Sequence, residues 1–209
     1  MNVGILGGAF DPPHLGHVAL AAAAVERFRL DRLLVRVVAD PAHKRVRAAP
    51  EIRLHLAELA FAPLDEAEVA LDPHARTVDS LEALALDDPV FLVGADEFAS
   101  FLDWKEPERV LELARLGVAT RPGTPGEALA TVLRSLSRPE RVELFAIEPL
   151  PVSSSALRAR ASRGESLAGL VPPAVAAEVE RLGLYRAAGV TAADRGYTEG
   201  DRTERTQTD

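Results

Sequence analysis

The stretch at residues 7–17, which reads GGAFDPPHLGH, constrains the fold of this chain more than any other. It follows the apolar run 3–6, typical of a short buried strand, and precedes residues 18–28, where apolar side chains recur at helical spacing. The glycines and histidines therefore lie on a strand-to-helix turn, at the strand end where open α/β sheets bind ligands. Glycines let a ligand approach the backbone, and a helix start offers free N–H groups to an anion.

His14 and His17 are three residues apart, so they can share a face of the first helical turn. Two imidazoles beside a helix N-terminus suit a phosphate better than a metal, because no third ligand is evident nearby. The other histidines, at 43, 55 and 74, have no spacing that indicates a metal site. We therefore predict a site that handles phosphate in nucleotide chemistry, with no metal ligands of its own. The alternative is a pair of ordinary surface histidines, but the glycines, Phe10 and Asp11 in register favour the site.

Strands and helices alternate along most of the chain, which predicts an α/β fold: a Rossmann-like parallel sheet with helices on both faces. We expect strands at 3–6, 32–38, 66–71, 89–93, 116–120 and 142–147. Residues 1–187 are predicted to form one domain, and the polar residues 188–209 a disordered tail.

Composition excludes several classes of protein. The 209 residues include no cysteine, which excludes disulfides and thiolate metal sites. No apolar run approaches the roughly 18 residues that a membrane helix needs, and the N-terminus does not resemble a secretion signal, so we expect a cytoplasmic protein without membrane contact. The formal net charge of -8 disfavours nucleic acid as a partner. A homo-oligomer is left open.

Four polar loops carry candidate chemistry: residues 7–17, 41–44, 94–96 and 153–158. The first three follow predicted strands and so share one edge of the sheet, where the set suits a polyphosphate flanked by a ribose. No covalent nucleophile stands out. Attack of one phosphate on the α-phosphate of a nucleoside triphosphate needs none, because positioning and charge stabilisation suffice. The histidines would stabilise the α-phosphoryl oxygens, while Lys44 and Arg158 hold pyrophosphate with Mg²⁺ bridging its oxygens.

Two of these loops resemble the paired signatures of the nucleotidyltransferases related to class I tRNA synthetases. Residues 7–17 resemble G-x-F-D-P-x-H-x-G-H, and residues 152–158 resemble I-S-S-T-x-I-R with Val152 for Ile and Ser155 for Thr. Within that superfamily, residues 41–44, 94–96 with Trp104, 120–123 and 170–185 are similar to segments of the bacterial nicotinate-nucleotide adenylyltransferases. The resemblance covers residues 1 to about 186. It implies the fold of HxGH nucleotidyltransferases and transfer of AMP from ATP to nicotinate mononucleotide, giving nicotinate adenine dinucleotide and pyrophosphate.

The resemblance also implies a role for each matching residue. The catalytic set is His14, His17, Lys44 and Arg158. The nucleotide-binding set is Gly7, Gly8, Ala9, Phe10, Gly94, Asp96, Ser153, Ser154 and Ser155. The set that faces the pyridine mononucleotide is Thr77, Val78, Trp104 and Lys105. Structural uses compete with some of these roles: the serines and Asp96 are also good helix caps, and tryptophans are mainly core residues.

The chain departs from the family pattern around the expected pyridine pocket. Residues 72–81 read DPHARTVDSL, so Arg76 stands where an aromatic is usual, and Lys105 follows Trp104 where a second aromatic is common. A cationic Lys105 is expected to favour nicotinate over its amide. The departures leave open transfer to another phosphate acceptor, such as nicotinamide mononucleotide or phosphopantetheine. A non-catalytic nucleotide-binding regulator is the alternative from another class, and the intact His14, His17 and Arg158 disfavour it.

Overall fold

The structure is a computed structural model that describes residues 1–41, 45–121, 123 and 126–186. Two parts of the predicted organisation lie outside these residues. One is Lys44, the predicted triphosphate contact, and the other is the polar tail at 188–209.

Six parallel strands form one sheet in the order β3-β2-β1-β4-β5-β6. They are β1 (Val3–Gly8), β2 (Arg32–Val38), β3 (Ala67–Asp72), β4 (Val90–Gly94), β5 (Arg115–Thr120) and β6 (Val142–Ala146). All six correspond to predicted strands, so the expected parallel α/β sheet is confirmed. The strand order reverses between β1 and β4, and ligands of such sheets bind at that switch point, outside the carboxyl ends of the strands.

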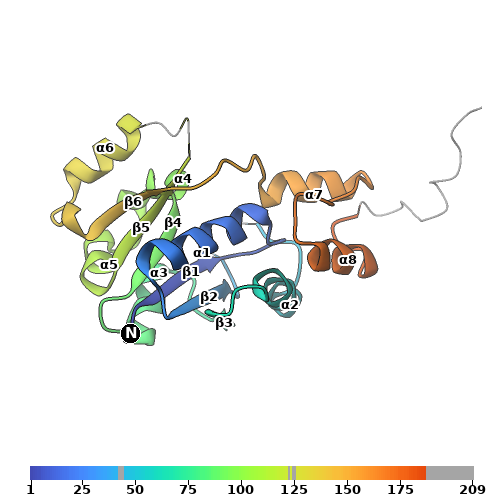
Figure 1. Ribbon diagram of the computed structural model, residues 1–209, viewed down its shortest axis with the longest axis horizontal. Helices are drawn as coiled ribbons and strands as arrows, with labels where there is room; N and C mark the ends of the chain where they lie inside the picture. The colour runs from blue at the N-terminus through green and yellow to red at the C-terminus, as the bar shows by residue number, and fades with distance from the viewer. Residues whose placement is uncertain (42–44, 122, 124–125, 187–209) are drawn as a thin grey trace, which may run out of the picture.

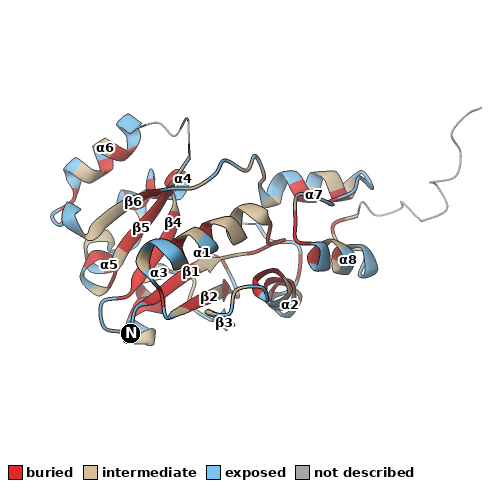
Figure 2. Ribbon diagram, in the orientation of Figure 1, coloured by how far each residue is buried: buried red, intermediate tan, exposed pale blue. Residues whose placement is uncertain are grey.

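Helices cover both faces of the sheet (Figure 1). One face carries α1 (Leu15–Phe28), α2 (Pro50–Phe61), α7 (Ser154–Ser162) and α8 (Pro173–Arg181). The other carries α3 (Thr77–Leu84), α4 (Ala95–Phe98), η1 (Phe101–Asp103), α5 (Pro107–Leu113) and α6 (Gly126–Ser135), and a further turn, η2 (Pro139–Arg141), precedes β6. Buried residues concentrate in the strands and on the helix surfaces that face them (Figure 2).

Each face of the sheet has its own hydrophobic core, because side chains alternate across a strand. In β2, Val35 and Val37 belong to the α1 core, while Leu34 belongs to the α3 core on the opposite face. Burial of the apolar faces of the helices against these two cores is the main favourable term for the fold. Among the helices of the described residues, none is both long and apolar enough to cross a bilayer.

Two local differences from the sequence expectation lie at the sheet edge. Helix α1 begins at Leu15 rather than near residue 18, with His14 as its N-cap in an extended conformation. The predicted loop after β4 is instead a single helical turn, α4, which is too short to show a helical period in the sequence.

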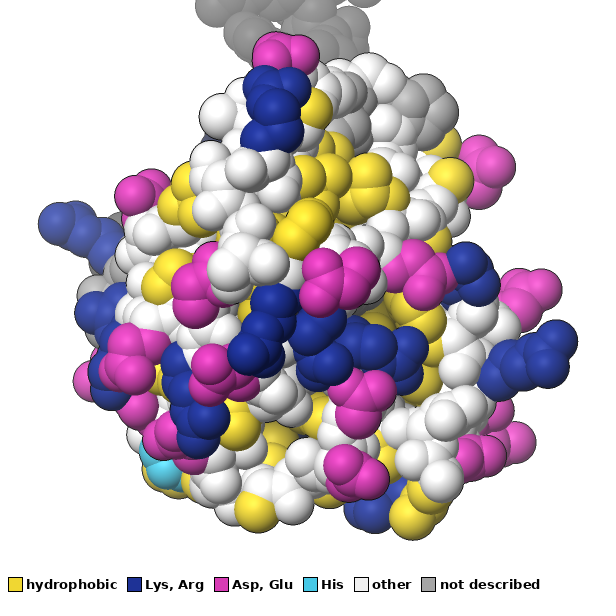
Figure 3. All heavy atoms as spheres, turned by 90° about the vertical axis from the view of Figure 1, so that its left-hand side faces the viewer, with side chains coloured by type: hydrophobic (Ala, Val, Ile, Leu, Met, Phe, Trp, Pro, Cys, Tyr) yellow, Lys and Arg dark blue, Asp and Glu magenta, His cyan; other side chains and the backbone are white. Residues whose placement is uncertain are grey.

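Basic and acidic side chains are interspersed over the end of the molecule where α5 and α6 lie (Figure 3). Several of them pair: Arg109 with Glu82 and Glu112, and Arg141 with Asp88. On the described part of this end, acidic side chains therefore lie next to basic ones and pair with several of them (Figure 3).

Candidate active site

A cavity of about 900 Å³ lies at the carboxyl edge of the sheet, over the switch point between β1 and β4. Nearly every described residue that the sequence placed in the site lines this cavity. They are Gly7, Gly8, Ala9, Phe10, His14, His17, Thr77, Gly94, Asp96, Trp104, Lys105, Ser153, Ser154, Ser155 and Arg158. The exception is Val78, whose side chain is 2% exposed and packs in the core beneath α3. Its side chain packs in the core and only its backbone stands at the start of α3, so its contact with the mononucleotide stays a prediction.

His14 and His17 stack on each other at the start of α1. Their ring centroids are 3.7 Å apart and the planes differ by 19°, so the prediction that they share a face is confirmed. The backbone N–H of His14 donates to Nδ1 of His17 at 3.2 Å. In the neutral imidazole only one nitrogen is protonated, so this bond places the proton of His17 on Nε2. Phe10 packs edge-on against His17, with ring centroids 5.0 Å apart.

His14 is the more enclosed of the two histidines, with 8% of its surface exposed. Burial lowers its pKa from the ordinary 6.5 to about 4, because a charged imidazole is poorly solvated there. His14 is therefore neutral at physiological pH and can donate one N–H. Its Nδ1 has no hydrogen-bond partner among the described residues. A neutral donor near the reacting phosphate would stabilise developing charge without pairing permanently to substrate.

Steric contact explains why the residue between the two histidines is a glycine. A Cβ at Gly16 would lie 3.1 Å from Nδ1 and 3.2 Å from Cε1 of His14, closer than most real contacts. Gly8 is similarly constrained, because a Cβ there would lie 2.9 Å from the ring of Phe10. Both glycines thus allow an aromatic ring to sit close to the backbone.

The start of α7 is joined to the turn that follows β1. Ser154 Oγ donates to the carbonyl oxygen of Pro12 at 2.9 Å. Arg158 Nη1 donates to the carbonyl oxygen of Asp11 at 2.7 Å and lies 3.7 Å from Oδ2 of that residue. The two signature segments, far apart in the sequence, therefore form one site. Ser153 caps α7, since its Oγ accepts from the N–H of Ala156, which is the structural use expected of a serine at this position.

The carboxylate of Asp11 organises this junction and is only 1% exposed. It accepts the backbone N–H of Arg47 at 2.7 Å, that of Ala48 at 3.2 Å and the hydroxyl of Tyr185 at 2.8 Å. Burial, together with the nearby Asp11 carboxylate, raises the pKa of Tyr185 well above its ordinary value, so the phenol remains a donor. Asp11 and Tyr185 belong to segments quoted in the family resemblance, but no local pattern pairs two residues so far apart in the chain.

A second buried charge supports the same loops. Arg53 on α2 is 0% exposed and donates to four backbone carbonyls: those of Ala9, Val38, Ala39 and Ala48. Burial lowers the pKa of Arg53, but arginine starts so high that it stays charged. The ends of β1 and β2 are therefore fixed to one guanidinium. On α2 this residue looks like a solvated helix charge, so sequence reasoning missed it.

Trp104 and Thr77 lie on the other face of the sheet edge, beside the α3 core. The indole packs edge-on against Phe91 and Phe101, with centroids 6.1 and 5.2 Å apart, while part of it lines the cavity. It is therefore both a core residue and a cavity wall. Lys105 next to it donates to Oδ1 of Asp79 at 2.6 Å, and that contact raises the pKa of Lys105.

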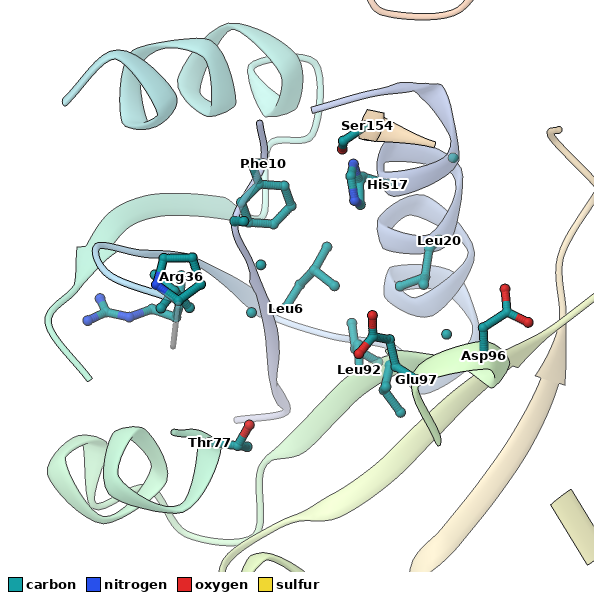
Figure 4. A pocket seen from close by; sticks show the side chains of 18 of the residues that line it. Leu6, Phe10, His17, Leu20, Arg36, Thr77, Leu92, Asp96, Glu97 and Ser154 are labelled. Carbon is teal, nitrogen blue, oxygen red and sulfur yellow. The ribbon is translucent and has the colours of Figure 1, made fainter. Parts of the chain in front are cut away.

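On the β4–β5 side, Asp96 stands in the first turn of α4 and accepts from Arg121 Nη2 at 2.6 Å. Gly94 precedes the helix, and a Cβ there would meet nothing within 4 Å. Gly94, Ala95 and Asp96, at the start of α4, all line the cavity. Figure 4 shows how the residues that line the cavity lie about β1. His17, Ser154 and Asp96 lie on one side of this strand, and Arg36 lies on the other.

Comparison with known proteins places this geometry in a family. Residues 5–160 match the model of the cytidylyltransferase-like family. A "Probable nicotinate-nucleotide adenylyltransferase" from a strain of Thermus thermophilus is 38% identical over 195 residues, covering 89% of this chain and 100% of the relative. One of the same name from Bordetella petrii is 37% identical, covering 88% and 99%.

Solved structures show the same fold. The nicotinic acid mononucleotide adenylyltransferase of Plasmodium falciparum, determined as a complex with NaAD, matches with a TM-score of 0.72 at 16% identity, over 88% of this chain and 97% of that one. A structure described as a putative nicotinate-nucleotide adenylyltransferase from Vibrio parahaemolyticus matches with a TM-score of 0.58 at 20% identity, over 89% and 96%. The protein therefore belongs to the cytidylyltransferase-like family and, within it, to the nicotinate-nucleotide adenylyltransferases.

Proposed function

We propose that this protein transfers AMP from ATP to nicotinate mononucleotide and releases pyrophosphate. One observation carries the proposal beyond family membership. The stacked pair of His14 and His17 and the α7 start with Arg158 converge on one cavity, and backbone and side-chain bonds at Asp11 and Pro12 hold them together. Such an arrangement suits a reaction that works by positioning and charge stabilisation.

In the proposed mechanism, the mononucleotide phosphate attacks the α-phosphorus of ATP. A P–O bond forms to the acceptor, and the bond to the β-phosphate oxygen breaks with its electron pair leaving on pyrophosphate. Nε2–H of His17 and the neutral imidazole of His14 donate to the α-phosphoryl oxygens. Arg158 and the N-terminus of α7 bind the β- and γ-phosphates, and Lys44 adds to that contact. The nucleotide lies toward Gly94 and Asp96.

Mg²⁺ is proposed to enter with ATP. Among the described residues there is no group of three His, Asp or Glu side chains that would hold a metal ion. Mg²⁺ is commonly held by substrate phosphates, water and one or two carboxylates, so this site fits a metal carried by the triphosphate. When bound, it neutralises charge on the departing pyrophosphate.

The test is release of pyrophosphate from ATP with nicotinate mononucleotide, nicotinamide mononucleotide or phosphopantetheine as acceptor. We expect the nicotinate form to give the highest kcat/KM. Changing both His14→Ala and His17→Ala should reduce kcat by orders of magnitude while ATP binding is largely kept, because the histidines act on the transition state. His55→Ala, an exposed histidine on α2, is the matched control. No release with any acceptor would refute the proposal, and a nucleotide-binding regulator would then be the function to test.

A further inference from the structure

Arg36 is a charged residue in the middle of an apolar strand, and the family resemblance assigned it nothing. It stands on the same face of β2 as Leu34, which packs in the α3 core, and on the opposite face from Val35 and Val37. Arg36 therefore faces the side of the sheet that carries Thr77 and Trp104, and it lines the cavity with them.

The guanidinium of Arg36 is not neutralised by the carboxylates around it. Its Nε is buried, with no hydrogen-bond partner among the described residues. The two carboxylates on the same face of the neighbouring strand are engaged elsewhere: Glu68 pairs with Arg32, and Asp72 accepts from Ser80 and contacts His74. An arginine stays charged under all ordinary conditions, and a buried unpaired donor costs free energy. A ligand anion is the natural complement.

The sheet leaves room for that anion. In register, Arg36 pairs with Gly7 of β1 on one side and Ala70 of β3 on the other. A Cβ added at Gly7 would meet only the ring of Phe91, at 3.5 and 3.6 Å, so Gly7 opens space on this face at the strand end. The space above Arg36 is continuous with the part of the cavity that Thr77 and Trp104 line.

We propose that Arg36 binds the ring carboxylate of nicotinate mononucleotide and so determines the preference for the acid over the amide. This inference rests on the proposed function. The ligand has two anionic groups, a phosphate and a carboxylate. The phosphate must reach His14 and His17, which start a helix on the α1 face, whereas Arg36 stands on the α3 face and lines the same cavity as Trp104. The sequence suggested Lys105 for this role, but its ammonium is already paired with Asp79 at 2.6 Å.

The chemistry of the two ring substituents explains the expected discrimination. A carboxylate offers two acceptor oxygens to the N–H donors of a guanidinium, and its negative charge balances the positive charge of that group. A carboxamide is neutral and presents N–H groups at one of those positions, so donor would face donor. Binding of the amide would also leave the positive charge of Arg36 buried and unpaired, which is the usual way a site rejects an analogue.

The experiment measures kcat/KM for nicotinate and nicotinamide mononucleotide, and KM for ATP, in the wild type, Arg36→Met and Arg36→Lys. Equilibrium binding of each mononucleotide is measured by calorimetry. We expect Arg36→Met to lower kcat/KM for the acid by about ten- to a hundredfold, with the amide unchanged or improved and KM for ATP unchanged. Arg36→Lys should restore part of the preference. Arg32→Met is the matched control, because Arg32 lies on the same face of β2, far from the cavity end, in an exposed pair with Glu68.

Equal losses for acid and amide would overturn the assignment and place the mononucleotide phosphate at Arg36 instead. An unchanged ratio in Arg36→Met would also overturn it. Circular dichroism identifies a variant that fails to fold. If Arg36→Met does so, the ratio of kcat/KM for acid and amide is measured in Arg36→Lys and Arg36→Gln instead. A wild type that neither binds nor converts a pyridine mononucleotide refutes the proposed function itself, whereas conversion with no dependence on Arg36 refutes only this inference.

Discussion

Removing the hydroxyl of Tyr185 should weaken the junction that holds the catalytic turn. Tyr185 is 7% exposed and donates to Oδ1 of Asp11 at 2.8 Å, although it lies just after α8 and Asp11 follows β1. In Tyr185→Phe the ring and its packing remain, but Oδ1 keeps only the longer bond from the N–H of Ala48, at 3.2 Å. The perturbation is thus one hydrogen bond to a buried carboxylate.

The magnitude follows from that bond. A hydrogen bond to a charged group contributes about 1.5–3 kcal/mol to the free energy of unfolding, and the burial of Asp11 prevents solvent from replacing it. At roughly 2–4 °C of Tm per kcal/mol for a chain of this size, Tyr185→Phe should lower Tm by about 3–12 °C. The guanidinium of Arg158 also bonds to Asp11, so KM for ATP is expected to rise as well.

Urea unfolding followed by circular dichroism measures the first effect. Thr131→Val is the matched control, because its hydroxyl donates to the carbonyl of Glu127 on exposed α6 and its loss should change stability by less than about 0.5 kcal/mol. The loss in Tyr185→Phe should shrink when Asp11→Asn is already present, since the charge is then gone. Equal midpoints for wild type and Tyr185→Phe would refute the reasoning, and so would a full loss in the Asp11→Asn background.

Three further outcomes are expected. Gly16→Ala should lower kcat for pyrophosphate release by about tenfold or more, because its Cβ would displace the ring of His14, and an unchanged kcat would contradict this. The free energy of unfolding should fall as the pH drops from 6.5 to 4. Folded His14 stays neutral until about pH 4, whereas His14 of the unfolded chain takes up a proton below 6.5, and this difference corresponds to about 3 kcal/mol. Urea titrations across this pH range should show that His14→Gln removes the effect. Ser153→Ala should cost about 1 kcal/mol of stability through the lost α7 cap, and a rise in KM for ATP in the same variant would show that Ser153 also binds phosphate.

Local patterns in the sequence predicted most of the fold because each strand shows an apolar run or an apolar alternation and is followed by a helix. The run at residues 89–93, for example, corresponds to β4 within one residue. The single turn of α4 was missed, since four residues cannot display a helical period. The start of α1 was placed too late because His14 caps the helix from an extended conformation, and histidine is not among the usual capping residues.

The candidate site was predictable where it is carried by short segments and not where it depends on tertiary contacts. The two histidines and Arg158 were found because each lies in a local motif. Arg53 was missed, since an arginine on a helix is ordinarily solvated and only the fold reveals that it is buried among carbonyl groups. Arg36 did leave a signal, a cation inside an apolar strand, but the strand alone does not show which face meets a cavity.

The α1 face of the sheet carries the residues proposed for the reaction, and the α3 face carries the residues proposed for the choice of acceptor. On the α1 face, Arg158 is held by its bond to the carbonyl oxygen of Asp11, so its loss should weaken ATP binding, whereas loss of the histidines should lower mainly kcat. On the α3 face, Arg36 and Trp104 line the cavity, Trp104 packs against the α3 core, and neither shares a hydrogen bond with that network among the described residues. Effects of substitutions on opposite faces should therefore be nearly additive in free energy. Acceptor specificity can then vary through strand and loop residues on one face while the phosphate chemistry of the other face is preserved.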